Sequence, residues 1–193
     1  MSDLAFHEQL IDRKARGLGL KISRISSSGK NLPAGVTQGD RLLIEQLRPY
    51  TMTSPERLWS LIEGVRFVIQ ENLVGDFVEC GVWRGGSVMA MALQLNQLGV
   101  SDRNLWLYDT FTGMTEPTDV DVESGTGKSA SDLLRTTDVG DGNNIWCVAG
   151  RTGVEANIAS TGYPMDLVTF VEGDVSETLH RTTPSQVALL RLD

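Results

Sequence analysis

The sequence predicts an α/β domain whose strands form a mostly parallel sheet. Two observations carry this prediction: short apolar runs alternate with helix-like patterns, and one run passes through a glycine-rich turn directly into a helix. The chain has 193 residues, of which 40% are hydrophobic and 22% charged, so it can bury a sizeable core.

Composition excludes several classes of function. A net charge of −8 and a pI near 4.8 argue against nucleic acid as a partner, because phosphate backbones require basic surfaces. Neither a membrane-spanning apolar run nor a signal-peptide pattern is present. The two cysteines, Cys80 and Cys147, have neither metal-site nor disulfide-framework spacing, and His7 and His180 lie far apart. We therefore expect a cytoplasmic protein without a membrane partner.

Residues 1–50 are predicted to form an N-terminal arm, irregular or partly helical, that precedes the domain of residues 51–193. Residues 26–35 have the composition of a loop. Such an arm is either a flexible tail or a lid that covers the active site or a second subunit. The second reading allows a homo-oligomer.

The first elements of the domain are a helix and a strand. Ser54 can cap the helix, Pro55 suits its first position, and Glu56 complements its dipole. Apolar residues then recur on one helical face: Leu58, Leu61, Ile62, Val65 and Ile69. The first strand is expected at 77–80, and an apolar helix from Ser87 to about Leu98 follows the glycine turn.

The glycine turn has the spacing G-x-x-x-G-G and not the dinucleotide fingerprint G-x-G-x-x-G. Its glycines let a ligand approach the backbone, but Glu79 at the strand end would repel a phosphate. This pattern favours a cationic or hydroxyl-rich ligand. An ordinary βα turn is the alternative.

A second strand is predicted at 104–108, and Asp109 follows it. Nucleotide-binding α/β folds place an acidic residue roughly 20 residues beyond the glycine turn, where it accepts both ribose hydroxyl protons. A surface aspartate is the alternative. Residues 112–150 are polar, with one helical stretch at 129–135, and are expected to form a lid or substrate loop.

The last predicted elements are a short helix at 154–160, a strand at 165–171, a helical turn at 176–180 and a strand at 187–192. Carboxyl ends of parallel strands meet at one sheet edge. We therefore expect the acidic residues at four strand ends to converge there: Glu79, Asp109, Asp174 and Asp193.

Several motifs resemble the macrocin O-methyltransferase family over residues 51–193. They are the block E-C-G-V-W-R-G-G-S (79–87), Asp109-Thr110-Phe111, Gly173-Asp174-Val175 and Leu190-Arg191-Leu192-Asp193. The resemblance implies a Rossmann-like class I methyltransferase fold. It also implies a magnesium-dependent enzyme that uses S-adenosylmethionine to methylate sugar hydroxyls in natural-product biosynthesis.

The resemblance also implies site residues. Asp109 would hold the ribose, and the other cofactor-binding residues would be Thr51, Met52, Glu79, Gly81, Trp83, Ser87, Thr110, Phe111, Gly173 and Asp174. For Trp83, packing at the turn is an alternative role. Asp193 would be a magnesium ligand, and the metal would activate a sugar hydroxyl.

The family's pattern continues beyond this aspartate with further metal ligands and strands, so the sheet is expected to be incomplete at its C-terminal side. A non-catalytic cofactor-binding fragment is therefore an alternative function. A nicotinamide-dependent oxidoreductase is weakened by the missing fingerprint and by the absence of a Tyr-x-x-x-Lys pair. The sequence names neither the acceptor nor a catalytic base.

Overall fold

A computed structural model describes residues 32–33, 35–114, 117–123, 125–136 and 147–192. The chain divides into two compact units, Met1–Ala34 and Gly35–Asp193, and the second carries all the elements below. Predictions on residues 1–31 and on Asp193 lie outside the described residues.

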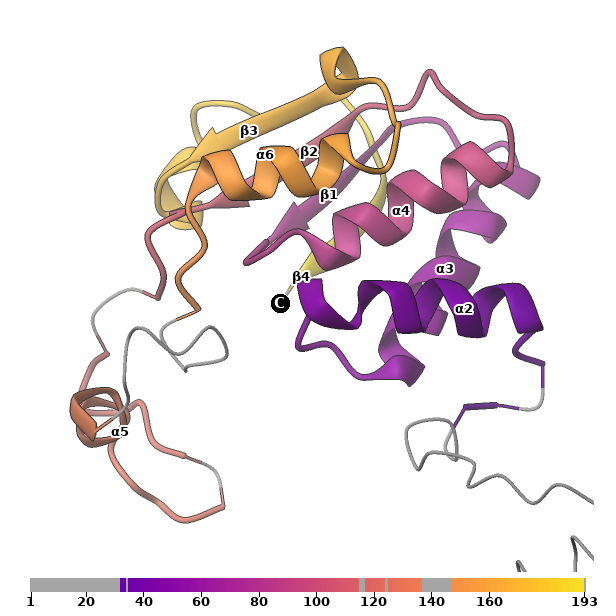
Figure 1. The fold of residues 1–193 in the computed structure, drawn as a ribbon. Coiled ribbons are helices and arrows are strands. Elements are labelled where there is room, and N and C mark those ends of the chain that lie inside the picture. Colours follow the sequence, from indigo (N-terminus) through magenta and orange to yellow (C-terminus); the bar gives the residue numbers. More distant parts are fainter. Residues whose placement is uncertain (1–31, 34, 115–116, 124, 137–146, 193) are drawn as a thin grey trace, which may run out of the picture. The chain divides into compact units, whose positions relative to one another are not determined.

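The sheet contains four parallel strands in the order β3-β2-β1-β4 (Figure 1). They are β1 (Asp76–Cys80), β2 (Leu105–Asp109), β3 (Val168–Glu172) and β4 (Val187–Leu192). This confirms the predicted parallel sheet. The third strand begins later than predicted, because Met165–Leu167 forms a 3₁₀ turn (η3) after Pro164.

The helices are α2 (Gln38–Leu47), the 3₁₀ helix η2 (Arg48–Tyr50), α3 (Pro55–Gln70), α4 (Gly86–Gln97), α5 (Ala130–Thr136), α6 (Arg151–Ala159) and α7 (Val175–Thr178). Five helices, α3 to α7, lie close to where the sequence predicts them, whereas α2 and η2 fall within the segment predicted as an arm. Ser54 caps α3 as predicted, since its hydroxyl accepts a hydrogen bond from the Arg57 amide. None of the helices in the described part of the chain is long and apolar enough to cross a membrane.

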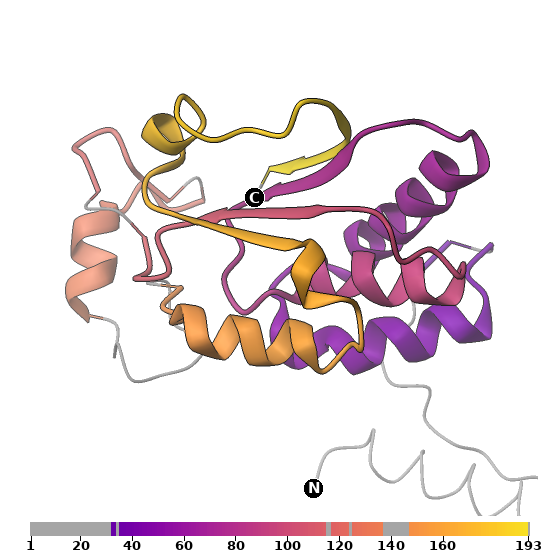
Figure 2. The same cartoon turned by 90° about the horizontal axis from the view of Figure 1, so that it is seen from above.

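The two faces of the sheet are covered differently. On one face, Phe77, Leu105 and Leu107 are fully buried, and α4 and α6 lie along this side (Figure 2). On the other face, Val78, Cys80 and Tyr108 form a small core, and the Tyr108 hydroxyl donates to the Thr182 carbonyl. β4 pairs with β1 and has no second neighbour among the described strands; Leu190 and Leu192 are 57% and 70% exposed.

Helix α2 lies within the predicted N-terminal arm but belongs to the same compact unit as the sheet. Asp40 and Thr37 form a capping box at its start, and the Asp40 side chain is only 2% exposed. The Arg66 guanidinium of α3 donates to the Asp40 carboxylate and also to the side-chain oxygen Oε1 of Gln94 in α4 (3.2 Å). This network holds α2 on α3 and α4. Whether residues 1–50 act as a lid stays a prediction.

Candidate cofactor site

A cavity of about 710 Å³ lies at the carboxyl ends of the strands, and we call it the carboxyl-end cavity. Open parallel sheets bind ligands at this edge, and the volume falls in the usual range of about 300–1,000 Å³ for small-molecule pockets. Its lining residues are Met52, Thr53, Arg57, Cys80, Gly81, Trp83, Tyr108, Asp109, Thr110, Gly113, Met114, Cys147, Gly173, Asp174, Val175, Leu179 and Leu192.

The turn between β1 and α4 is held by the Asp109 carboxylate. One oxygen (Oδ2) accepts hydrogen bonds from the backbone amides of Val82 (2.5 Å) and Trp83 (3.1 Å), and the other (Oδ1) accepts from the Phe111 amide (2.7 Å). A carboxylate offers about four acceptor positions. Among the described residues, three of these positions are taken by backbone amides, all from residues next to the two strand ends.

The same turn contains unusual backbone conformations. Gly81 and Gly85 have φ of 84° and 85°, and Trp83 adopts a φ of 47°, which is uncommon for a bulky residue. The hydrogen bonds from the Val82 and Trp83 backbone amides to Asp109 stabilise this arrangement. Strained backbone of this kind concentrates at functional sites.

Gly86 allows the segment before α3 to lie directly on the start of α4. A Cβ atom at this position would lie 2.5 Å from the Tyr50 carbonyl oxygen and 2.6 Å from Cβ of Thr51. Both neighbours are close to the backbone and cannot swing aside. Glycine at this position therefore keeps residues 51–54, which we call the pocket loop, next to the cavity.

A buried ion pair connects β1, β4 and the pocket loop. Glu79 and Arg191 are paired in the sheet register, and the Arg191 Nη1 donates to Glu79 Oε1 at 2.5 Å. The other terminal nitrogen of Arg191 donates to the Thr53 hydroxyl at 2.6 Å. The side chains of Glu79 and Arg191 are 1% and 13% exposed, so this pair is shielded from solvent.

Burial also affects two protonation equilibria beside the cavity. Burial, helped by the nearby Glu79 charge, raises the pKa of the Cys80 thiol. Burial and the neighbouring Cys80 raise the pKa of Tyr108. Both side chains therefore stay neutral at physiological pH. In contrast, hydrogen bonds from the Ser176 side chain and backbone lower the pKa of Asp174, which is ionised.

The profile of the macrocin O-methyltransferase (TylF) family matches residues 45–193. The chain belongs to this family. Its fold is the Rossmann-like methyltransferase fold, and the order β3-β2-β1-β4 corresponds to the first four strands of the Rossmann order 3-2-1-4-5-6.

Two curated relatives of this macrocin O-methyltransferase family member come from Streptomyces. The chain is 32% identical over 144 residues to 8-demethyl-8-(2,3-dimethoxy-alpha-L-rhamnosyl)-tetracenomycin-C 4'-O-methyltransferase of Streptomyces olivaceus, covering 75% of this chain and 51% of the relative. It is 31% identical to demethyldecarbamoylnovobiocin O-methyltransferase of Streptomyces niveus, with the same coverage. The chain thus spans about half the length of these relatives.

A solved structure agrees with these matches. The O-methyltransferase NovP superimposes with a TM-score of 0.60 at 30% identity, and the match covers 75% of this chain and 55% of NovP. The similarity therefore extends from sequence to the arrangement of the strands.

The structure brings together most of the residues predicted from the family motifs. Seven of them line the carboxyl-end cavity: Met52, Gly81, Trp83, Asp109, Thr110, Gly173 and Asp174. The other four lie behind it. Thr51 contacts the Gly86 position, Glu79 pairs with Arg191, Ser87 is buried in the first turn of α4, and Phe111 packs its ring 6.0 Å from that of Phe170.

Several cavity residues were missed by the motif analysis. Cys80, Tyr108 and Leu192 point to the same side of three adjacent strands, which the strand register makes evident but which a motif does not. Thr53 and Arg57 lie next to the predicted start of the helix at Ser54, so their closeness to Thr51 and Met52 in the sequence could have identified them as cavity residues. Met114 and Cys147 come from the long polar insertion, whose path the sequence does not predict.

The described residues do not supply a magnesium site. No group of three or more His, Cys, Asp or Glu side chains in this part of the chain is arranged to hold a metal ion. Of the acidic residues at strand ends, Asp109 bonds backbone amides, Asp174 bonds Ser176 and Glu79 pairs with Arg191. Asp193, the predicted ligand, lies outside the described residues.

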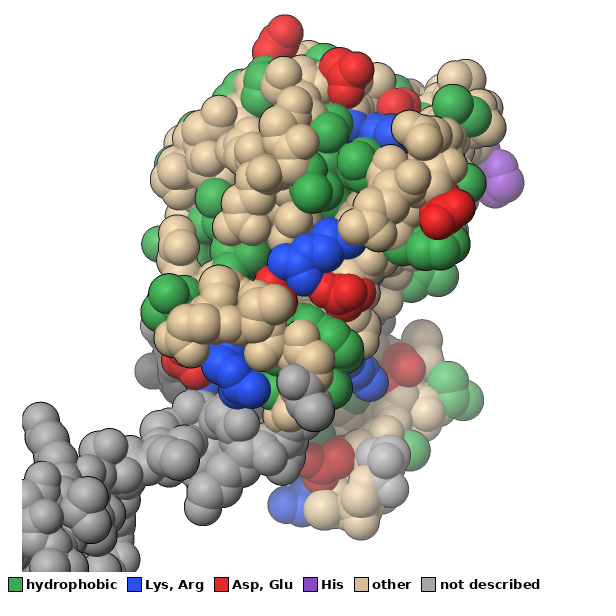
Figure 3. Space-filling model, turned by 90° about the vertical axis from the view of Figure 1, so that its right-hand side faces the viewer, with side chains coloured by type: hydrophobic (Ala, Val, Ile, Leu, Met, Phe, Trp, Pro, Cys, Tyr) green, Lys and Arg blue, Asp and Glu red, His purple; other side chains and the backbone are tan. Residues whose placement is uncertain are grey.

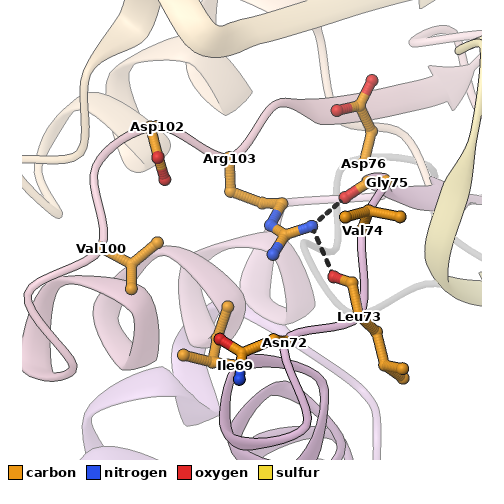
Figure 4. A pocket seen from close by; sticks show the side chains of 9 residues that line it. All are labelled: Ile69, Asn72, Leu73, Val74, Gly75, Asp76, Val100, Asp102 and Arg103. Atoms are coloured by element: carbon orange, nitrogen blue, oxygen red, sulfur yellow. Dashed lines mark hydrogen bonds between the residues drawn. The ribbon is translucent and has the colours of Figure 1, made fainter.

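A second cavity of about 500 Å³ lies at the opposite edge of the sheet, near the amino ends of β1 and β2 (Figure 4). The Arg103 guanidinium crosses it and donates to the carbonyls of Leu73 (3.1 Å) and Gly75, while its plane lies over the Phe77 ring. Asp76 is bonded to Asn104 and Trp106. These polar groups therefore brace the loop between α3 and β1.

The surface is of mixed charge. On the face in Figure 3, acidic and basic side chains lie among hydrophobic ones, without a continuous basic area. This distribution agrees with the net charge of −8.

Proposed function

We propose that this protein is an S-adenosylmethionine-dependent O-methyltransferase that methylates a hydroxyl of a sugar or a related natural product. The observation that supports the proposal best is the carboxyl-end cavity, which lies beside a turn that Asp109 holds in place. The chain in which this cavity occurs belongs to the macrocin O-methyltransferase family. S-adenosylmethionine use is implied by the family.

The residues at the cavity fit this cofactor chemically. Gly81 and Gly173 have φ of 84° and 134° and carry no side chain, so a ligand can approach their backbone closely. Within the described part of the chain, Oδ1 of Asp109 accepts a single hydrogen bond, from the Phe111 amide, so it can also accept one from a ribose hydroxyl while its hydrogen bonds to backbone amides persist. Met52, Trp83 and Met114 provide apolar and polarizable surface for the adenine and the sulfonium-bearing chain.

When bound, S-adenosylmethionine supplies an electrophilic methyl group to an acceptor hydroxyl. The described residues contribute positioning: the pocket loop lies on one side of the cavity, and Thr110, Gly173 and Asp174 lie at the ends of β2 and β3. The acceptor would enter beside Met114 and Cys147, which line the cavity. Magnesium assistance with Asp193 as a ligand is part of the proposal on the family resemblance alone, and we assign no step to it.

Calorimetry tests the cofactor half of the proposal. The chain should bind S-adenosylmethionine and S-adenosylhomocysteine but not NAD, and Asp109→Ala should abolish measurable binding. NAD binding, or S-adenosylmethionine binding that survives Asp109→Ala unchanged, would contradict the assignment.

Methyl transfer tests the catalytic half. Radioactive methyl groups from S-adenosylmethionine should be transferred to at least one glycosylated acceptor in a panel of deoxysugar-bearing compounds. The assay is run once with added magnesium and once with EDTA. Cofactor binding without transfer to any acceptor would favour the alternative, a cofactor-binding fragment.

We also propose a cytoplasmic location, which cell fractionation would test. A homo-oligomer is a further possibility, which light scattering would test.

A further inference from the structure

We propose that Arg191 is a positioning residue that holds the pocket loop (residues 51–54) against the cofactor cavity by linking Thr53 to Glu79. The inference rests on the proposed function for the identity of the ligand. The contacts that carry it involve three segments that are far apart in the sequence.

Both terminal nitrogens of the Arg191 guanidinium donate to side chains of other segments. Its Nη1 donates to Glu79 Oε1 on the neighbouring strand at 2.5 Å, and its Nη2 donates to Thr53 Oγ1 at 2.6 Å. A planar guanidinium can hold two acceptors at fixed positions at the same time, and a lysine ammonium on a flexible stem holds them far less well. The residue type therefore matters, in addition to its charge.

The location of the pair explains why an arginine occurs in an otherwise apolar strand. Glu79 is 1% exposed, and a buried carboxylate requires a cationic partner. Arg191 is its partner in the register of β1 and β4, where the sheet itself places the two side chains together. The pair is thus a rigid anchor within the sheet.

The segment that this anchor holds is part of the cavity wall. Met52 and Thr53 both line the carboxyl-end cavity, whereas neither Glu79 nor Arg191 does. The loop has a local bond from the Thr53 amide to the Thr51 hydroxyl (3.0 Å), and Thr51 lies against the Gly86 position. The Arg191–Thr53 bond joins this loop to the sheet. Glu79 thereby influences cofactor binding through Arg191 and Thr53.

Thr53 offers a matched pair of variants that leave the buried ion pair intact. Thr53→Val keeps the shape and removes the hydroxyl, and Thr53→Ser keeps the hydroxyl. We expect Thr53→Val to weaken S-adenosylhomocysteine binding by roughly tenfold, the effect of one hydrogen bond to a charged group. Thr53→Ser should bind within about twofold of the wild type. The urea midpoint of Thr53→Ser should stay close to the wild type, whereas Thr53→Val should remain folded with a lower midpoint, because the Arg191 Nη2 loses its Thr53 acceptor.

Hydrogen exchange of the Met52 and Thr53 amides gives a readout that does not depend on the ligand. Without ligand, both Thr53→Val and Arg191→Lys should increase exchange in the pocket loop, while Thr53→Ser should not. Unchanged exchange in Thr53→Val, or equal loss of affinity in the Val and Ser variants, would overturn the inference. A wild-type protein that binds no S-adenosylhomocysteine would instead overturn the proposed function, since the exchange result would stand by itself.

Discussion

The Asp109 carboxylate at the end of β2 accepts a 2.5 Å hydrogen bond from the backbone amide of Val82, in the turn that follows β1. This bond, with those from the Trp83 and Phe111 amides, joins two neighbouring strand ends through one side chain. Asp109 therefore shapes the site before any ligand arrives. The proposed hydrogen bond to a cofactor ribose would have to form without displacing these three amides.

Asp109→Asn should destabilise the protein, because one of the two carboxylate oxygens would be replaced by an NH₂ group that faces a backbone N–H. We expect the free energy of unfolding to fall by about 1–3 kcal/mol, the cost of unsatisfied buried donors. Urea denaturation measures it. Asp102→Asn, an exposed change at the opposite sheet edge, is the control and should stay within about 0.5 kcal/mol of the wild type. Equal urea midpoints for the two variants would contradict this role of Asp109.

Gly86→Ala should displace the pocket loop, because the new methyl group would lie 2.5 Å from the Tyr50 carbonyl oxygen. We expect a loss of about 1–3 kcal/mol in unfolding free energy from overpacking, together with weaker S-adenosylhomocysteine binding. The control is Gly153→Ala within α6, where no atom lies within 4 Å of the added Cβ. That variant should gain about 0.5–1 kcal/mol. Thermal melts and calorimetry compare them, and a Gly86→Ala variant as stable as the wild type would be inconsistent with this packing.

Asp40 should make the stability of the domain sensitive to acid. Its burial opposes ionisation, but hydrogen bonds from Arg66 and Thr37 outweigh that effect and hold the pKa of Asp40 below its usual value. A carboxyl with a lower pKa in the folded state stabilises the fold above its unfolded pKa of about 3.9. That contribution is lost as the pH falls through the folded pKa.

Asp40→Asn should therefore lower the unfolding free energy at pH 7 and flatten its decline below about pH 4. Asp132→Asn, which breaks an exposed ion pair with Arg135, is the control and should leave the pH profile unchanged. Urea midpoints from pH 3 to pH 7 measure both. An Asp40→Asn profile parallel to the wild type would show that Asp40 does not carry this dependence.

The two cysteines should differ in reactivity with a thiol reagent. Burial and the Glu79 charge raise the pKa of Cys80, which keeps it in the unreactive thiol form at pH 7.5, whereas Cys147 is partly exposed at the cavity. Labelling with Ellman's reagent should show a fast phase that Cys147→Ser removes and Cys80→Ser retains. S-adenosylhomocysteine should slow that phase. A fast phase lost in Cys80→Ser would reverse the assignment.

Local patterns in the sequence predict the strands and most helices well, because each element carries its own periodicity and cap. Ser54-Pro55 at the start of α3 and the apolar run 187–192 are examples. Helix α2 was less evident, since it is stabilised by Asp40, Arg66 and Gln94 acting across three helices. Such contacts between distant residues leave no periodic signal.

The candidate site shows the same division. The resemblance to the family predicted residues on the glycine turn, at the strand ends and in the pocket loop, and seven of these line the cavity. What motifs do not reveal is which partner each side chain has. Asp109 accepts hydrogen bonds from three backbone amides, and these depend on the register of the strands. The contacts of Arg191 with Glu79 and Thr53 depend on strand register and on the path of the pocket loop.

The position of β4 has a consequence for how the protein folds. The Glu79–Arg191 contact spans 112 positions of the chain, and pairing over so long a separation requires closure of a large loop. During synthesis β1 emerges from the ribosome well before β4 is made, so the Glu79 carboxylate remains hydrated until Arg191 emerges. Burial of this edge of β1 must then await β4, so the carboxyl-end cavity is completed only after β1, β2 and β3 have been synthesised.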